Sequence, residues 1–139
     1  MIAFYLFGVF ALFGAILKTL ILAQISTRTS ITLAFVVLAL LFILQNTFEF
    51  LGYWTFESDQ ALAYLFIDGL MISLIFTAPA AIHFIGRTIG NGIAMATVPV
   101  LLVFGCFLTY LLIAGDVVLT YEHVGYTIVS VPGPAYWLF

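Results

Sequence analysis

Nine charged residues divide this chain of 139 residues into long apolar stretches, and their spacing constrains the fold more than any motif does. A helix needs about 20 mostly apolar residues to cross the hydrocarbon core of a bilayer. Four uncharged apolar runs approach or exceed that length, at residues 1–17, 29–48, 69–86 and 88–115. Short polar segments separate the runs. The pattern is typical of a membrane protein that crosses the bilayer several times.

The overall composition excludes most soluble functions. Hydrophobic residues make up 65% of the chain and charged residues 6%, whereas soluble domains carry roughly 25% charge. Three basic residues cannot form the clustered Lys and Arg surface that nucleic-acid binding needs. The single cysteine, Cys106, lies inside the last apolar run and cannot pair within one copy of the chain. Because no nucleophile, base and acid share a common depth, we expect no enzymatic activity and no cofactor.

We expect an all-α integral membrane protein with four transmembrane helices. The polar breaks place these helices at about residues 2–24, 31–53, 61–85 and 93–114. Ser58 or Asp59 is expected to cap the third helix. Residues 1–114 then form a four-helix bundle, and residues 115–139 form a tail. The first run lacks the basic region and small-residue cleavage site of a signal peptide, so we interpret it as a retained helix.

The charges at the breaks alternate in sign and predict an orientation. Lys18, Arg28 and Arg87 lie in or beside the first and third breaks. By the positive-inside rule these breaks face the cytoplasm. The second break and the tail carry acidic residues instead, namely Glu57, Asp59, Asp116 and Glu122. We therefore expect the N-terminus and the tail to be extracytoplasmic, with the helices in the inner (plasma) membrane of a bacterium.

The tail has a different pattern from the helices. Residues 117–131 are rich in Val, Ile, Thr and Tyr, and residues 124–131 alternate in part between apolar and polar. We expect a short β-like segment, a strand or hairpin lying on the helix bundle, with Gly125 marking its turn. A Pro-Gly-Pro sequence at 132–134 then precedes an aromatic group at 135–139. That group is typical of the aromatic belt at a membrane interface and would stand at the start of a truncated fifth helix.

Three polar residues inside the predicted spans are candidates for a functional site. Asp68 lies about 12 Å inside the third helix at 1.5 Å per residue. Asn46 lies at a similar depth on the antiparallel second helix, and Glu49 lies one turn nearer the surface. The three can form one polar cluster that opens outward and binds a ligand, a proton or a cation. The alternative, which we favour, is an interhelical hydrogen-bond clamp that fixes helix register.

Basic groups mark the expected cytoplasmic interface, and they are Lys18, Arg28, His83 and Arg87. His83 and Arg87 are spaced i, i+4 near the end of the third helix, where cations favour both the helix C-terminus and anionic headgroups. Lys18 is expected to extend from the first helix to the interface. A haem held by two histidines is not expected, because His123 lies in the tail on the other side. We predict no metal site.

Small and aromatic residues indicate association with lipid and with protein. Small residues recur four positions apart in pairs that allow close helix approach, at Ala11 and Ala15, Thr77 and Ala81, and Gly92 and Ala96. We expect these faces to pack on one of three partners: another helix of the same chain, another membrane subunit or a second copy of the chain. In the tail the expected partner contacts are Tyr121, His123, Tyr126, Tyr136 and Trp137.

The expected extracytoplasmic N-terminus and three segments together carry a family resemblance, and the segments are Asn46 to Trp54, Pro79 to Phe84 and Pro132 to Phe139. In these features the layout resembles the N-terminal seven-helix membrane region of some bacterial sensor histidine kinases. The resemblance implies an input module, since in that family seven spans carry the following signalling domain into the cytoplasm. Four helices and the start of a fifth would correspond to the first half of that region. The family has no sharply defined ligand residues, so the resemblance assigns none here.

Two functions from different classes follow from this pattern. The first is a non-catalytic sensory input module of a bacterial signalling protein, which relays an extracytoplasmic or intramembrane stimulus. The second is a small accessory or structural subunit that packs within a larger integral membrane complex. A continuation beyond Phe139, through further helices to an output domain, is the feature that would distinguish the first from the second.

Overall fold

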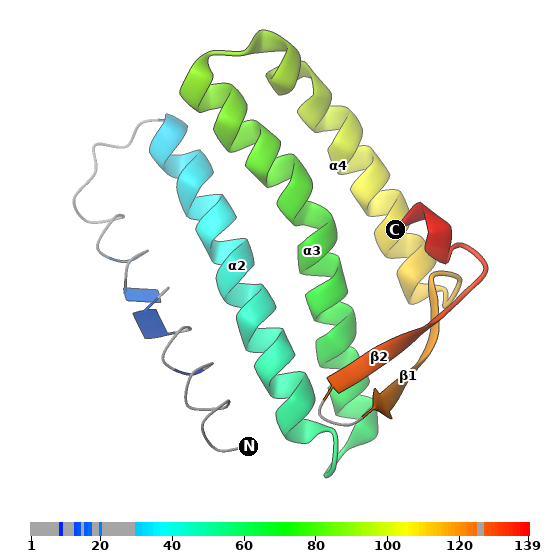
Figure 1. The fold of residues 1–139 in the computed structure, drawn as a ribbon. Helices are drawn as coiled ribbons and strands as arrows, with labels where there is room; N and C mark the ends of the chain where they lie inside the picture. The colour runs from blue at the N-terminus through cyan, green and yellow to red at the C-terminus, as the bar shows by residue number, and fades with distance from the viewer. Residues whose placement is uncertain (1–8, 10–12, 15, 18–19, 21–29, 125–126) are drawn as a thin grey trace.

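Three long helices form the main body of the protein (Figure 1). The computed structural model describes residues 9, 13–14, 16–17, 20, 30–124 and 127–139. Helix α2 spans Ser30–Thr55, α3 spans Gln60–Ile89 and α4 spans Gly92–Ile113. Each of the three is long and apolar enough to cross a membrane. The protein is therefore mostly helical, as the sequence predicts.

The first predicted helix, residues 2–24, falls largely outside the described residues. Residues 9, 13–14, 16–17 and 20 of this range are described, and they are helical. The count of four spans and the orientation in the membrane stay predictions.

Short polar caps define the ends of α3 and the start of α4. The Asp59 carboxylate accepts a hydrogen bond from the Leu62 backbone N–H over 3.0 Å, which confirms one of the two predicted caps. At the other end Gly90 adopts the left-handed conformation, with φ of 67°, and its N–H bonds to the carbonyl of Gly86. The Asn91 side chain then accepts from the backbone N–H groups of Ile93 and Ala94. Helix α3 thus continues to Ile89, four residues beyond the range expected from the sequence.

Helix α3 lies between α2 and α4, antiparallel to both (Figure 1). Its contact with α2 extends along most of its length, because the Phe35 and Phe84 rings meet 5.7 Å apart and the Phe48 and Phe66 rings 6.4 Å apart. Glycines allow α3 and α4 to pack closely. Gly86 of α3 packs on Met95 and Ala94 of α4, and Gly105 of α4 packs on Ile75 and Phe76 of α3.

The unequal lengths of α3 and α4 leave one end of α3 uncovered by α4. Helix α3 has 30 residues and α4 has 22, or about 45 Å against about 33 Å. The glycine contacts fix their register, and continuing that register places Ile113, the last residue of α4, level with residues 67–68 of α3. The first two turns of α3 therefore extend past α4, and Asp68 lies level with the end of α4.

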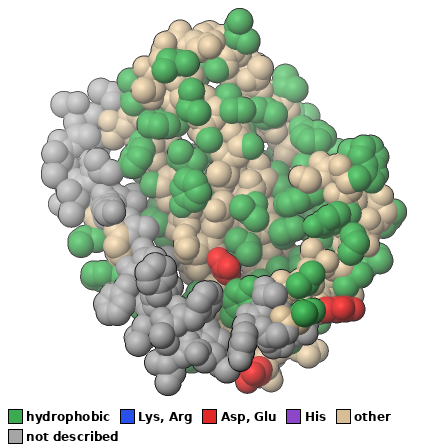
Figure 2. Space-filling model, in the orientation of Figure 1, with side chains coloured by type: hydrophobic (Ala, Val, Ile, Leu, Met, Phe, Trp, Pro, Cys, Tyr) green, Lys and Arg blue, Asp and Glu red, His purple; other side chains and the backbone are tan. Residues whose placement is uncertain are grey.

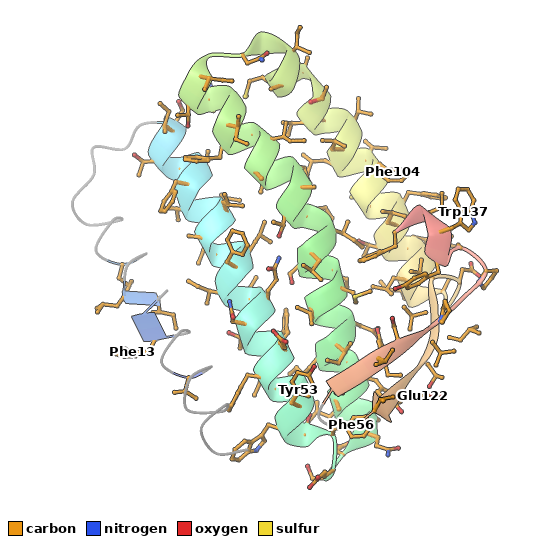
Figure 3. All side chains as sticks on the ribbon, viewed as in Figure 1. Phe13, Tyr53, Phe56, Phe104, Glu122 and Trp137 are labelled. Carbon is orange, nitrogen blue, oxygen red and sulfur yellow. The ribbon has the colours of Figure 1, made fainter. Side chains whose placement is uncertain are left out.

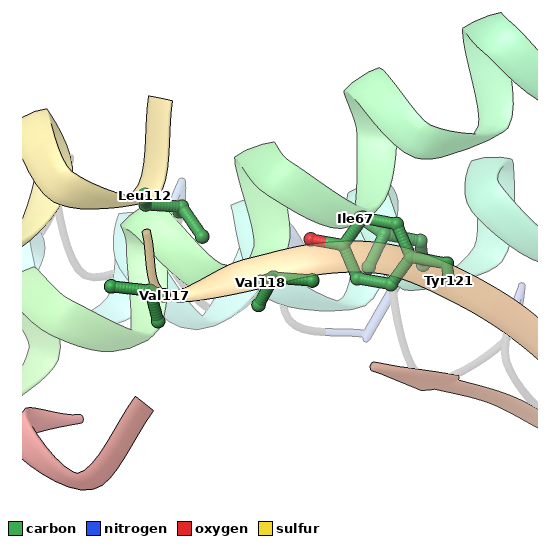
Figure 4. Close-up of a cluster of buried hydrophobic side chains, with 5 residues drawn as sticks. All are labelled: Ile67, Leu112, Val117, Val118 and Tyr121. Atoms are coloured by element: carbon green, nitrogen blue, oxygen red, sulfur yellow. The ribbon is translucent and has the colours of Figure 1, made fainter. Parts of the chain in front are cut away.

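A β-hairpin covers the extended end of α3. Strand β1 (Val118–Val124) pairs antiparallel with β2 (Thr127–Pro132), with Tyr121 opposite Ser130 and Glu122 opposite Val129. This confirms the β structure predicted for the tail, while the predicted turn at Gly125 lies outside the described residues. Beneath the hairpin a buried apolar cluster joins it to α3 and α4 (Figure 4), and its members are Ile67, Leu112, Val117, Val118 and Tyr121.

The end of the chain is tied back to the segment that follows α4. The Gly133 N–H donates to the carbonyl of Val117 over 2.8 Å, and the Ala135 N–H donates to the carbonyl of Asp116 over 2.9 Å. Gly133 has no room for a side chain, because a Cβ there would collide with the Asp116 carbonyl. The chain then forms a short 3₁₀ helix, η1 (Tyr136–Leu138), at the place where the sequence predicts the start of a fifth helix.

Candidate functional site

A tyrosine–aspartate hydrogen bond joins the hairpin to α3. The Tyr121 hydroxyl donates to Oδ1 of Asp68 over 2.5 Å. One turn earlier on α3, the Tyr64 hydroxyl donates to the backbone carbonyl of Tyr121 over 3.1 Å. The rings of the two tyrosines are 5.4 Å apart. Two side chains of α3 thus hold one hairpin residue by both its side chain and its backbone, and we call Tyr64, Asp68 and Tyr121 the hairpin junction.

Local periodicity explains how these three groups come together. Tyr64 and Asp68 are spaced i, i+4, so they lie on one face of α3. Successive residues of a strand point to opposite faces of a hairpin. Tyr121 accordingly turns inward and is only 6% exposed, whereas the next residue, Glu122, is exposed (Figure 3). A strand that buries its tyrosine against the side of α3 meets the carboxylate of Asp68 there.

The junction holds the Tyr121 hydroxyl in its neutral form. Burial raises the pKa of the Tyr121 phenol above its ordinary value, and the hydrogen bond to Asp68 and the negative charge of that carboxylate raise the pKa further. The neutral phenol is therefore a stable donor to Asp68 under ordinary conditions.

A second polar contact joins α2 to α3 deeper in the bundle. The Gln45 side-chain amide donates to Oγ1 of Thr77 over 2.5 Å and, more weakly, to the Ser73 carbonyl at 3.4 Å. The Thr77 hydroxyl in turn donates to the Ser73 carbonyl over 2.8 Å. Gln45 and Ser73 are both buried. These three residues are a hydrogen-bond clamp between the two helices, which we call the amide clamp.

The structure gives different partners to the residues of the predicted polar cluster. Asp68 binds Tyr121 of the hairpin. The Asn46 amide donates to the Phe42 carbonyl of its own helix over 2.7 Å, and Asn46 is exposed. Glu49 is exposed as well. Gln45, and not its neighbour Asn46, therefore makes the hydrogen-bond clamp to α3, because Gln45 is the residue that faces α3.

The predicted basic interface is described only in part. Arg87 is exposed in the last turn of α3, and His83 lies half-buried one turn before it. They stand at the opposite end of α3 from the hairpin junction. Lys18 and Arg28 lie outside the described residues.

The tail residues expected to contact partners divide into two groups. Tyr121 is buried in the hairpin junction and is not available to another molecule. Tyr136 and Trp137 are exposed on η1, and Trp137 is 80% exposed. Tyr126 and the side chain of His123 lie outside the description.

Hydrogen bonds are the polar contacts that the structure describes at this site. Among the residues that the structure describes, no group of three or more His, Cys, Asp or Glu side chains is placed to hold a metal ion. Within the same residues, every buried side-chain nitrogen and oxygen has a hydrogen-bond partner. No protein-family model, curated protein or solved structure matches the chain.

Part of the site was detectable in the sequence. Asp68 stands out as a carboxylate within an apolar helix, and the hairpin is signalled by its β-forming residues. The partnership with Tyr121 is not signalled, because the two residues are 53 positions apart. The i, i+4 pair of Tyr64 and Asp68 was the available signal that a polar group packs on this face of α3.

Proposed function

We propose that the chain is a membrane-embedded, non-catalytic input module of a signalling protein, in which the hairpin receives a stimulus and α3 carries it across the membrane. The observation that carries the proposal is the hairpin junction. It is a localised contact between a segment at the end of the bundle and a helix long enough to span the bilayer.

The position of α3 supports a relay. This helix contacts both α2 and α4, so a tilt of α3 as a whole would change its packing against both neighbours (Figure 1). Its two ends are about 45 Å apart at 1.5 Å per residue. Pro79 lies between the hairpin junction and the basic end at Arg87, and it removes one backbone hydrogen bond from α3. Displacement of the hairpin would thus be transmitted along a central helix that has a weakened point.

The proposal is tested by releasing the junction and observing the far end of α3. A nitroxide spin label is attached at Ile89→Cys, the exposed last residue of α3, in a Cys106→Ala background that removes the only native cysteine. We expect Tyr121→Phe to change the mobility of this label in proteoliposomes. The matched control is Tyr110→Phe, which removes a hydroxyl from an exposed tyrosine of α4.

A second label on β2, at the exposed Val129→Cys, reports on the hairpin itself. A relay requires both labels to respond to Tyr121→Phe and neither to respond to Tyr110→Phe. If the label on Val129→Cys changes and the label on Ile89→Cys does not, the hairpin is released without any signal reaching the far end, and the relay is contradicted.

The exposed face of α4 favours a second candidate, a small accessory subunit of a larger membrane complex. Five large side chains at helical spacing are each at least two thirds exposed, and they are Ile93, Val100, Val103, Tyr110 and Ile113. Such a face accommodates either lipid or a partner helix. Extraction from the native membrane followed by measurement of the particle mass tests this candidate, since a subunit would be recovered with stoichiometric partners.

A further inference from the structure

The hairpin end of the bundle exposes large apolar side chains that the folded chain does not cover. Trp137 is 80% exposed, Ile113 is 74% exposed and Leu119 is 64% exposed. Figure 2 shows apolar side chains continuing from the helices onto this part of the surface. An exposed apolar edge of this kind needs a partner, because contact with water is unfavourable.

The length of α4 shows where this edge lies relative to a bilayer. Its 22 residues extend about 33 Å, close to the thickness of about 30 Å of a bilayer's hydrocarbon core. When α4 spans that core, Ile113 at its C-terminus marks one boundary of the hydrocarbon. Leu119, six residues later, follows directly beyond this boundary.

Backbone hydrogen bonds hold the segment that carries Trp137 close to the C-terminal end of α4. The Ala135 N–H bonds to the carbonyl of Asp116, only three residues after the end of α4. Helix η1 follows Ala135 directly, and its three residues rise only about 6 Å. Trp137 is therefore held within about one helical turn of the hydrocarbon boundary, and Figure 3 shows it pointing away from the bundle.

The charges at this end of the molecule restrict the partner. Four exposed carboxylates lie at this end of the molecule, in the loop before α3, after α4 and on β1, and they belong to Glu57, Asp59, Asp116 and Glu122. No Lys or Arg accompanies them among residues 30–68, 105–124 and 127–139 of the described chain. Anionic lipids and acidic protein surfaces are disfavoured by this arrangement, whereas Trp and Tyr favour the headgroup region of any bilayer.

We infer that Ile113, Leu119 and Trp137 form a lipid-contacting edge that seats the hairpin in the interface of a zwitterionic bilayer. The edge holds the hairpin at the depth where the hydrocarbon ends, with its carboxylates directed to the water. The inference rests on the membrane placement in the proposed function and is independent of signalling. It makes the lipid interface itself a contact of the segment that carries Tyr121.

The test uses single-tryptophan proteins in phosphatidylcholine vesicles with brominated acyl chains. Trp54→Phe leaves Trp137 as the sole tryptophan, since the chain has two. Two matched proteins, in a Trp54→Phe and Trp137→Phe background, carry the probe at Val103→Trp on the exposed face of α4 or at Glu57→Trp in the loop before α3. Bromine quenches tryptophan on contact in the bilayer, and iodide quenches it in water.

We expect bromine placed near the headgroup end of the acyl chains to quench more than about half of the Trp137 emission, because interfacial Trp residues lie at that depth. We also expect deep bromine to quench Val103→Trp and iodide to quench Glu57→Trp. Phosphatidylglycerol added to the vesicles should leave the Trp137 result unchanged or weaken it.

Three other outcomes would each contradict either the lipid contact of Trp137 or the membrane placement of the chain. Iodide quenching of Trp137 to the extent seen for Glu57→Trp, with Val103→Trp still quenched by bromine, overturns the lipid contact and leaves the membrane placement standing. A Trp137 shielded from both quenchers is covered by protein, such as a second copy or a subunit, and this also overturns the inference. Failure of bromine to quench Val103→Trp overturns the membrane placement itself.

Discussion

Helix α3 makes two polar contacts that differ in depth and in chemistry. Its contact with α2 uses the neutral amide clamp of Gln45, Ser73 and Thr77, which lies near the middle of the bundle because Thr77 directly follows the Ile75 and Phe76 that pack on Gly105. Its contact with the hairpin uses a carboxylate, Asp68, at the level where α4 ends.

The difference follows from the cost of charge at depth. A charged side chain costs several kcal/mol at the centre of a bilayer and much less near the interface. An amide and a hydroxyl can satisfy each other in the middle of the bundle without any charge. A carboxylate gives a stronger hydrogen bond, and Asp68 lies where the hairpin covers one side of α3. In the proposed membrane placement this level is close to the interface.

The two contacts also differ in how much depends on single residues. The α2–α3 contact is distributed over aromatic and aliphatic pairs along most of both helices. The hairpin depends on a small apolar cluster, the hairpin junction and the close fit of Gly133. Substitutions in the hairpin are therefore expected to have larger effects than substitutions in the clamp.

The largest effect is expected for Gly133→Ala. The new Cβ would collide with the Asp116 carbonyl, and backbone on one side must move. We expect the free energy of hairpin opening to fall by about 3 kcal/mol, the upper end of the range for overpacking, as measured by amide hydrogen exchange of β1 and β2. Gly92→Ala is the control, since a Cβ there meets no atom within 4 Å. Equal exchange in the two variants would contradict the close fit.

A smaller loss is expected for Tyr121→Phe. The change leaves the ring in the apolar cluster but removes the donor to Asp68, and a hydrogen bond to a charged group contributes about 2 kcal/mol. The same exchange measurement applies. Asp68→Asn keeps an oxygen that can accept from Tyr121, so it should cost less than half as much. A larger loss for Asp68→Asn than for Tyr121→Phe would mean that Asp68 has another role.

Gln45→Leu is expected to cost about 1 kcal/mol of bundle stability, as is usual for hydrogen bonds between membrane helices. The Thr77 hydroxyl keeps its bond to the Ser73 carbonyl, so no buried donor is stranded. The measurement is unfolding from mixed micelles, with Asn46→Leu as the neighbouring control whose amide bonds within its own helix. If both variants lose the same stability, the amide clamp contributes nothing beyond a general effect of polarity.

The smallest effect is a pH dependence of hairpin docking. Because docking raises the pKa of Tyr121 above the ordinary value of about 10, the docked state binds the phenolic proton more tightly. The contribution of Tyr121 is complete below that pH and decreases as the pH rises further. We expect the spin label at Val129→Cys to become mobile at high pH, and Tyr121→Phe to remove this component of the pH profile. An unchanged profile in Tyr121→Phe would assign the effect to another group.

The sequence was sufficient for features that depend on local composition. Long uncharged runs predict α2, α3 and α4, because an apolar helix satisfies its own backbone hydrogen bonds and is suited to a bilayer. Ser58 and Asp59 were both predicted as caps of α3 from their place before an apolar run, and the structure shows that Asp59 is the cap. The β-forming residues of the tail predicted β structure that the hairpin confirms.

Features that depend on which helix face meets which neighbour were not predictable in the same way. Gln45 and Asn46 are adjacent and chemically alike, yet only Gln45 faces α3, since a step of one residue turns a helix by about 100°. The same limit applies to Asp68, whose position within an apolar helix is evident from the sequence but whose partner lies on a strand 53 residues later.

The sequence by itself determined that this protein consists mainly of apolar helices with a β-forming tail, because hydrophobicity and β-propensity are properties of contiguous residues. Only the tertiary structure decided that α3 extends past α4, that the hairpin covers the extension, and that Asp68 bonds to Tyr121 there. These depend on helix register, which glycine contacts such as Gly105 on Ile75 and Phe76 fix through close packing between distant segments.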